Sequence, residues 1–495
     1  MKTLLPSRKN ERSDGLPGLL REALATLLRW LRALLLLPVL GHAQVTVDWA
    51  QEPGGVAVAG DWKGNVYTVR FDSNLAGDIL LIKHNSSGVL QWTASYDQTD
   101  NTKWDKAVWV TCDPAGNAIV CGTLMSGYSN PVNAASILMK FNPAGDLLWR
   151  VVYDSAFDGS STRRCLVDGS GNIYVLGLGM GPGGLVSRVK AFNPDGSARW
   201  DWFDSQGIGA AQHFKFAPDQ AILIYCRGIT GSINGYAKLD LAGNTVWSLP
   251  GINSLTAGDL AGDSEGNSYI LHGEYVANGG TVLRKLDFVG ATLWSVTHPF
   301  GGFRVEVGSD DQPVACGFGP PNSGGAAFVK FDSSGGVVWQ NLNADGSQNL
   351  LLHAQMLLDS RNNAYLAAGT LFQMAVCKVD HDGRDGWLAL LSGGSGASSI
   401  AMGPNGQVYV AGGNTVQLGQ AHEPLPAALE MGRRNGCFTL SVIGEMGRAY
   451  RVEVSDDFVQ WRPFVTAWLA SGHQVYSDPD SPTKPSRFYR MAPAD

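Results

Sequence analysis

The stretch Asp113–Gly122 reads DPAGNAIVCG, and the stretch Lys140–Trp149 reads KFNPAGDLLW. In both, the flanks are short and apolar, and the centre is built from Asp, Asn, Pro and Gly, the residues that form tight turns. Each stretch therefore predicts a β-hairpin. Two hairpins in succession predict a four-stranded sheet that recurs every 45–50 residues or so, roughly the period of a propeller blade.

Both stretches recur along the chain. The unit that runs from Lys to Trp occurs seven times, at Lys83–Trp92, Lys140–Trp149, Lys190–Trp200, Lys238–Trp247, Lys285–Trp294, Lys330–Trp339 and Lys378–Trp387. The Asp-containing hairpin occurs eight times, the last at Ser399–Gly412. Sheets of this kind bury their faces by stacking radially, which makes a propeller. A linear solenoid of the same units is the alternative.

The missing eighth Trp strand is found near the other end of the chain. Val45–Trp49 reads VTVDW and matches the strand around Trp92, which follows Trp49 by 43 residues. We therefore predict an all-β fold whose main domain, residues 44–420, is an eight-bladed β-propeller closed by the N-terminal strand. A seven-bladed propeller is the alternative.

The repeats resemble those of secreted bacterial β-propeller repeat proteins and, more distantly, quinoprotein-like propellers, whose repeats also place Gly a few residues before Trp. The tail resembles a small β-sandwich-like module found at the C-termini of large secreted bacterial proteins, on the segments Ala449–Trp461 (AYRVEVSDDFVQW) and Tyr476–Arg490 (YSDPDSPTKPSRFYR). These likenesses imply fold far more than function. We predict a linker at 421–432, which Pro424 and Pro426 suit, and a C-terminal β module at 433–495.

Residues 1–43 have the order of a secretory signal peptide. Seven Lys/Arg residues, mixed with three acids, are followed by the apolar run Ala33–Leu40 and by Gly41-His42-Ala43. An uncleaved membrane anchor is the alternative, but three arginines interrupt the segment, and a span needs roughly 20 apolar residues. We expect a secreted or cell-surface protein without a membrane span after signal removal, and the periplasm remains open as a location.

Composition excludes several classes of protein. The chain has 62 Gly, 15 Trp, 44% hydrophobic residues and only 16% charged residues, which is unlike an acidic disordered chain. Its net charge of -7, without a basic stripe, argues against nucleic acid as a partner. The seven Cys are scattered without a CxxC motif, so we interpret them as small buried hydrophobic residues. We expect a monomer.

Short motifs point to no catalytic residue. The GxSxG match at Gly262–Gly266 is a hairpin turn of the repeat, and the GxGxxG match at Gly179–Gly184 is followed by a strand, Val186–Phe192, so neither has the helix that its motif needs. Asp380, Asp382 and Asp385 (DHDGRDG) suggest a calcium loop, but position twelve of an EF-hand would be Leu391. Calcium bound in another way remains open, and no other cofactor or metal is predicted.

Binding residues are expected on the long links between hairpins, which alternating strands place at one end of the propeller. Trp104, Tyr128, Asp158 and Arg163 lie on or next to these links and combine stacking with polar groups. We predict them as ligand-binding residues; ordinary solvated loop residues are the alternative.

These observations favour a secreted binding or scaffolding protein that presents a propeller face to a protein or glycan ligand. The alternative is a secreted enzyme of quinoprotein-like or polysaccharide-active type, which would need ionisable side chains converging at the channel. A structural surface or matrix protein is a third reading. The sequence names neither a ligand nor a reaction.

Overall fold

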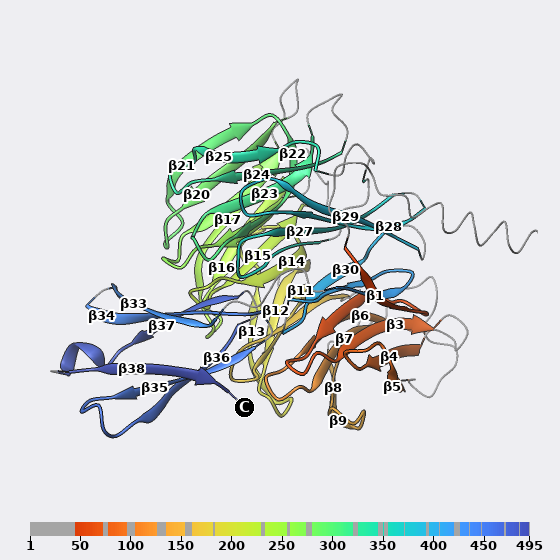
Figure 1. Ribbon diagram of the computed structural model, residues 1–495, viewed down its shortest axis with the longest axis horizontal. Helices are drawn as coiled ribbons and strands as arrows, with labels where there is room; N and C mark the ends of the chain where they lie inside the picture. Colours follow the sequence, from red (N-terminus) through yellow and green to blue (C-terminus); the bar gives the residue numbers. More distant parts are fainter. Residues whose placement is uncertain are drawn as a thin grey trace, which may run out of the picture. The chain divides into compact units, whose positions relative to one another are not determined.

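The computed structural model describes residues 45–72, 78–96, 104–125, 135–153, 161–181, 184–228, 233–254, 258–273, 280–319, 325–344, 350, 355–370, 372–392, 396–404, 406–419, 426–434, 436–446, 448–469, 472–484 and 486–494 (Figure 1). The predicted signal peptide, residues 1–43, lies outside this part of the chain. Within it, no helix is both long and apolar enough to cross a membrane.

The fold is all-β. Eight four-stranded antiparallel sheets are β2–β5 (Ala57–Gly60, Val66–Asp72, Asp78–His84, Leu90–Tyr96), β6–β9 (Trp104–Cys112, Ala118–Met125, Ala135–Phe141, Leu147–Tyr153), β10–β13 (Ser161–Val167, Ile173–Gly181, Gly184–Phe192, Ala198–Phe203), β14–β17 (Ala210–Phe216, Ile222–Arg227, Ile233–Leu239, Thr245–Asn253), β18–β21 (Asp259–Gly262, Ser268–Gly273, Thr281–Leu286, Thr292–His298), β22–β25 (Gly301–Val307, Pro313–Phe318, Ala326–Phe331, Val337–Asn341), β26–β29 (Gln355–Leu358, Ala364–Gly369, Met374–Val379, Asp385–Leu391), and β30–β32 (Ser399–Met402, Val408–Ala411, Thr415–Leu418) with β1 (Val47–Gln51).

The N-terminal strand completes the last of these sheets, as VTVDW predicts. β1 pairs antiparallel with β32, which gives the order β1-β32-β31-β30. The indole Nε1 of Trp49 donates a hydrogen bond to Gln417 Oε1 at 3.0 Å, and Gln417 Nε2 donates to Asp48 Oδ2 at 2.9 Å. Because β2 contacts β30, the first and last sheets are neighbours.

The first hairpin of each repeat is shaped by its Asp. Asp113 Oδ1 accepts hydrogen bonds from the backbone N–H groups of Ala115 and Asn117, and Asn117 Nδ2 donates to Asp113 Oδ2. Gly116 supplies the positive φ of +79° that the turn needs. Equivalent bonds are made by Asp61, Asp168, Asp263 and Asp359.

The recurring Trp packs each sheet onto the next. Trp92 Nε1 donates to the carbonyl of Pro143 in the following sheet at 3.1 Å, and Lys83 Nζ donates to the same oxygen at 2.7 Å. Gly145 in that turn has φ +98°, and a Cβ there would lie 2.9 Å from the Trp92 ring. The same Trp–Gly contact joins Trp49 with Gly88, Trp149 with Gly196, Trp200 with Gly243, Trp247 with Gly290, Trp294 with Gly335 and Trp339 with Gly383.

Most of the Lys residues that open this unit are buried rather than solvated. Lys140 Nζ lies 2.8 Å from Asp113 Oδ2 and donates to the carbonyl of Pro194 at 3.1 Å, so one cation joins turns from two sheets. Lys83, Lys238, Lys285, Lys330 and Lys378 are buried as well. These side chains act in turn formation and sheet packing.

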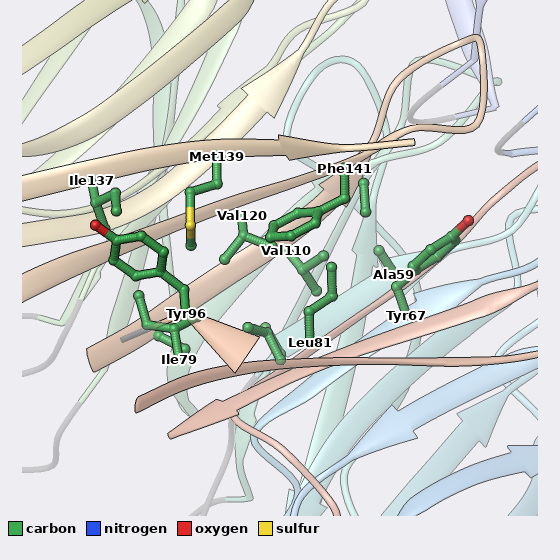
Figure 2. Close-up of a cluster of buried hydrophobic side chains, with 14 of the residues drawn as sticks. Ala59, Tyr67, Ile79, Leu81, Tyr96, Val110, Val120, Ile137, Met139 and Phe141 are labelled. Atoms are coloured by element: carbon green, nitrogen blue, oxygen red, sulfur yellow. The ribbon is translucent and has the colours of Figure 1, made fainter. Parts of the chain in front are cut away.

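The core lies between neighbouring sheets. Figure 2 shows Ile79 and Leu81 of β4 facing Ile137 and Met139 of β8, with Val120 of β7 among them; all five are at most 1% exposed. The middle strands are apolar at successive positions, so Val120 packs on one face of its sheet while Ile119 and Cys121 pack on the other.

The C-terminal module consists of two three-stranded sheets. One has the order β33-β34-β37 (Ala428–Arg434, Cys437–Ile443, His473–Asp478), and the other the order β36-β35-β38 (Arg462–Trp468, Ala449–Ser455, Phe488–Pro493), with a 3-10 helix at Ser481–Thr483. β33 begins inside the stretch 421–432 that was expected to be a linker. Arg487 is held by both oxygens of Asp478, at 2.7 and 3.0 Å.

Candidate functional site

The first strand of each sheet contributes one equivalent residue to the interior of the propeller. Counted four residues back from the first residue of the following turn, these inner positions are Ala57, Trp109, Arg164, His213, Asp259, Arg304, Gln355 and Ser399. Six of them, from Trp109 to Gln355, line a single cavity of about 270 Å³. That volume is near the lower end of the range for small-molecule sites. We call it the channel cavity.

A β-bulge precedes the inner position in several of these strands. The register shifts directly before Trp109, Arg164, His213 and Arg304. A bulge bends a strand and re-aims its side chains, and bulges are frequent next to binding sites. The bulged residues Arg163 and Gln212 are exposed and also line the cavity, so the channel cavity reaches the surface on this side.

Asp259 is the centre of an ionic cluster. Its carboxylate is fully buried; His213 Nε2 lies 2.9 Å from Oδ1, and Lys215 Nζ lies 3.3 Å from Oδ2. The N–H of Val305 donates to Oδ2 at 3.0 Å. Lys215 also lies 2.7 Å from Glu306 Oε1, so one lysine bridges both acids of the cavity.

The surroundings set the charge of each group. Burial by itself would raise the pKa of Asp259, but Lys215 and His213 outweigh it and hold the pKa well below its usual range. Burial lowers the pKa of His213 to about 4, despite the nearby Asp259. Burial also raises the pKa of Glu306, although Lys215 opposes the shift and the side chain keeps 27% of its surface accessible. At pH 7 His213 is therefore neutral and Asp259 is charged.

Arg164 is a cation of the cavity that stacks on an aromatic ring. Its guanidinium lies 4.1 Å from the ring centroid of Trp109, at the inner position of the preceding sheet. Its Nε is buried, and within the described residues it has no hydrogen-bond partner. Burial lowers the pKa of Arg164 to about 10, partly offset by Glu306. The group is still a cation at pH 7, with donors available to a ligand.

The channel cavity is positive overall. Its basic lining residues are Arg163, Arg164, Lys215 and Arg304, and its acidic lining residues are Asp259 and Glu306. The chain as a whole carries a formal charge of -7. A concave site with the sign opposite to its protein concentrates ligands of complementary charge, so this cavity favours anions.

Of the predicted binding residues, Arg163 lies at the channel cavity. Trp104 begins β6 opposite Met125, but its side chain lies outside the described part of the chain. Tyr128 and Asp158 are outside the described residues altogether. The inner positions were not predicted. Counting four residues back from each repeated turn would have shown that Arg164, His213 and the other inner residues occupy equivalent positions in successive repeats.

The DHDGRDG loop does not present a free ligand set for a cation. Asp380 Oδ1 is 2.6 Å from Lys378 Nζ, Asp382 Oδ2 is 3.2 Å from Arg384 Nε, and the Asp385 side chain is not described. Within the residues that the structure covers, no group of three or more His, Cys, Asp and Glu side chains could hold a metal. The sequence leaves calcium binding at this loop open, and the structure does not test it.

Comparison with known proteins supports the fold. No protein-family model and no curated protein sequence matches the chain. A solved structure described as the Dos1 propeller aligns with a TM-score of 0.52 at 9% identity, covering 75% of this chain and 93% of that one. A streptogramin B lyase structure aligns at 0.43 with 10% identity, covering 76% and 96%, and a Bacteroides caccae protein of unknown function at 0.35 with 13% identity, covering 66% and 94%. With the sheet topology, the first of these likenesses identifies the chain's architecture as a β-propeller.

Proposed function

We propose that the protein is a binding protein whose propeller holds a charged ligand group in the channel cavity. The observation that carries the proposal is that four consecutive sheets use the same inner position to line one cavity. These residues are Arg164, His213, Asp259 and Arg304. Concave sites with a few convergent polar groups are where proteins bind ligands.

The fold itself does not require these charges. In the sheet β2–β5 the same inner position is Ala57, which is fully buried in the apolar core. Burying charged groups is costly unless they are paired, and replacing them with well-packed apolar residues is often neutral or stabilising. A cluster that carries this cost, in a cavity that reaches the surface, supports a role in binding.

The proposal also covers the protein's location and the kind of molecule that carries the charged group. The order of basic, apolar and small residues in 1–43 supports export, so we propose a secreted or cell-surface monomer. Because Arg163 lines the channel cavity and is exposed, the bound charged group can be part of a protein, a glycan or a free small molecule.

An enzyme is the less favoured reading. The cavity does bring ionisable groups together, but His213, with a pKa of about 4, is a weak base at pH 7. Asp259 has both carboxylate oxygens occupied by partners from His213, Lys215 and the backbone. A general base works best with a pKa near the operating pH and a free acceptor.

A screen of the purified protein against peptides, glycans and small molecules, with and without calcium, tests the proposal. The variant Arg164→Gln removes a cavity cation, and Arg384→Gln is the matched control because Arg384 lies on the surface with 84% of its side chain accessible. We expect a hit that loses at least about tenfold affinity with the first variant and none with the second, a loss typical of one charge-assisted hydrogen bond. A ligand that binds both variants equally would place the site elsewhere, and chemical turnover of the ligand would favour the enzyme.

A further inference from the structure

We propose that the channel cavity binds a small amphipathic carboxylate, with its carboxylate on Arg164 and its apolar body along the turn side of the cavity. This inference rests on the proposed function and narrows it to one ligand class. Three features carry it: which charges in the cavity are already satisfied, the geometry of Arg164, and the change from polar to apolar lining along the strands.

Lys215 is the cation that contacts both acids of the cavity. Lys215 Nζ has three acceptors, Asp259 Oδ2 at 3.3 Å, Glu306 Oε1 at 2.7 Å and the carbonyl of Val305 at 3.0 Å. Lys215 therefore contacts one oxygen of each acid, although its single charge balances only one of them, and His213 is a further neighbour of Asp259. Among the described residues that line the cavity, no carboxylate forms an ion pair with Arg164, although Glu306 is near enough to raise its pKa.

Arg164 is preorganised for a planar acceptor. The ring of Trp109 lies against its guanidinium, which fixes the plane and leaves the edge with its N–H donors for a ligand. The Nε of Arg164 is buried and has no hydrogen-bond partner among the described residues. A guanidinium edge matches the two oxygens of a carboxylate with parallel hydrogen bonds, and stacking reduces the entropy lost when they form.

The rest of the lining is apolar. Towards the turns the cavity is bounded by Leu166, Phe216, Val307, Leu357, Leu358 and Met446. Leu166 follows Arg164 by two residues on β10, so both project from the same face of the strand, about 7 Å apart. An inorganic anion would gain nothing from these apolar groups, whereas a carboxylate with a short apolar body contacts both ends of the cavity.

Calorimetric titration of the whole protein with matched probes tests the ligand class. The probes are hexanoate, its neutral analogue hexanamide, acetate and inorganic phosphate. We expect hexanoate to bind at least tenfold more tightly than each of the other three. Binding of hexanamide equal to hexanoate would overturn the role of the charge, and phosphate binding as tight as hexanoate would show a site for anions of any kind.

Two variants, with one control, test where in the cavity the carboxylate and the apolar body of hexanoate bind. Arg164→Gln is expected to abolish the preference for hexanoate over hexanamide without lowering the melting temperature, because the arginine is not part of a structural ion pair. Leu166→Ala is expected to reduce the preference for hexanoate over acetate, and Arg384→Gln to change neither ratio. A lower melting temperature in Arg164→Gln, with the probe preferences intact, would make the arginine a structural residue and refute the proposal.

Failure of this inference can be told apart from failure of the proposed function. If the broad screen yields another class of ligand whose affinity depends on Arg164, the cavity is a binding site but the carboxylate assignment is wrong. If neither the probes nor the screen gives binding that depends on Arg164, both proposals fail.

Discussion

The contact between Trp92 and Gly145 offers a direct test of how neighbouring sheets are joined. The substitution Gly145→Ala puts a Cβ at φ +98°, 2.9 Å from the Trp92 ring. A non-glycine residue in the left-handed region costs about 1–2 kcal/mol. The ring must also move out towards an ordinary contact of about 3.5–4 Å, and overpacking of this kind adds about 1–3 kcal/mol.

A matched control separates the two contributions. Gly171 has a similar φ, +78°, but a Cβ there meets only Pro194, at an ordinary 3.4 Å. Gly171→Ala should therefore cost only the backbone strain of about 1–2 kcal/mol, and Gly145→Ala about 2–5 kcal/mol in total. Displacing Trp92 also strains its 3.1 Å hydrogen bond to the Pro143 carbonyl, which accounts for the upper part of the range.

Urea unfolding of the two single variants measures these costs, and the double variant Gly145→Ala with Trp92→Leu isolates the contact. In the background of Trp92→Leu the added methyl meets a smaller side chain, so its cost should fall to that of Gly171→Ala. If Gly145→Ala costs no more than the control, or the same with and without Trp92, the inter-sheet contact does not stabilise the propeller as described.

Three further outcomes concern titratable side chains. His272 and His213 each have a pKa lowered to about 4 by burial, so between pH 6.5 and 4 the unfolded chain binds more protons and stability falls as the pH falls. From pH 7 to 5 the loss is about 2 kcal/mol per histidine, and urea midpoints across this range should drop less steeply in His272→Gln. Asp478→Asn leaves the buried Arg487 without its bidentate partner and should destabilise the C-terminal module by about 3–5 kcal/mol, seen as earlier proteolysis of residues 426–494. By contrast Glu453→Gln, whose partner Arg490 is 54% exposed, should cost under about 1 kcal/mol in the same assay.

The architecture was predictable because its determinants repeat. Asp113 with Asn117, and Trp92 with the Gly of the next turn, are local patterns that recur with a fixed period, and each has a stereochemical reason. The lone strand VTVDW could be assigned because it resembles the others. The strands of the C-terminal module do not repeat, and β36, at Arg462–Trp468, contains Pro463, where its pairing with β35 shifts register.

The channel cavity could not be recognised in the same way. Its residues occupy one repeated position but differ in kind, so Arg164, His213 and Asp259 make no motif. Lys215 and Glu306 are 91 residues apart in the chain and meet only because their strands line the same interior. The predicted site residues followed the rule that binding groups lie on loops, whereas most of the charged groups here project from the inner strands, re-aimed by bulges.

The pairing of β1 with β32 has a consequence for how the protein is made. A ribosome produces Trp49 early, yet its partner Gln417 follows 368 residues later. Until then β1 has no neighbouring strand, and its edges stay open to pairing with other chains. Because contacts this distant in sequence close late, the complete propeller cannot form before nearly all of the chain has left the ribosome. Until β1 pairs with β32, the sheets synthesised earlier form an open stack, and its first and last sheets each lack one neighbour.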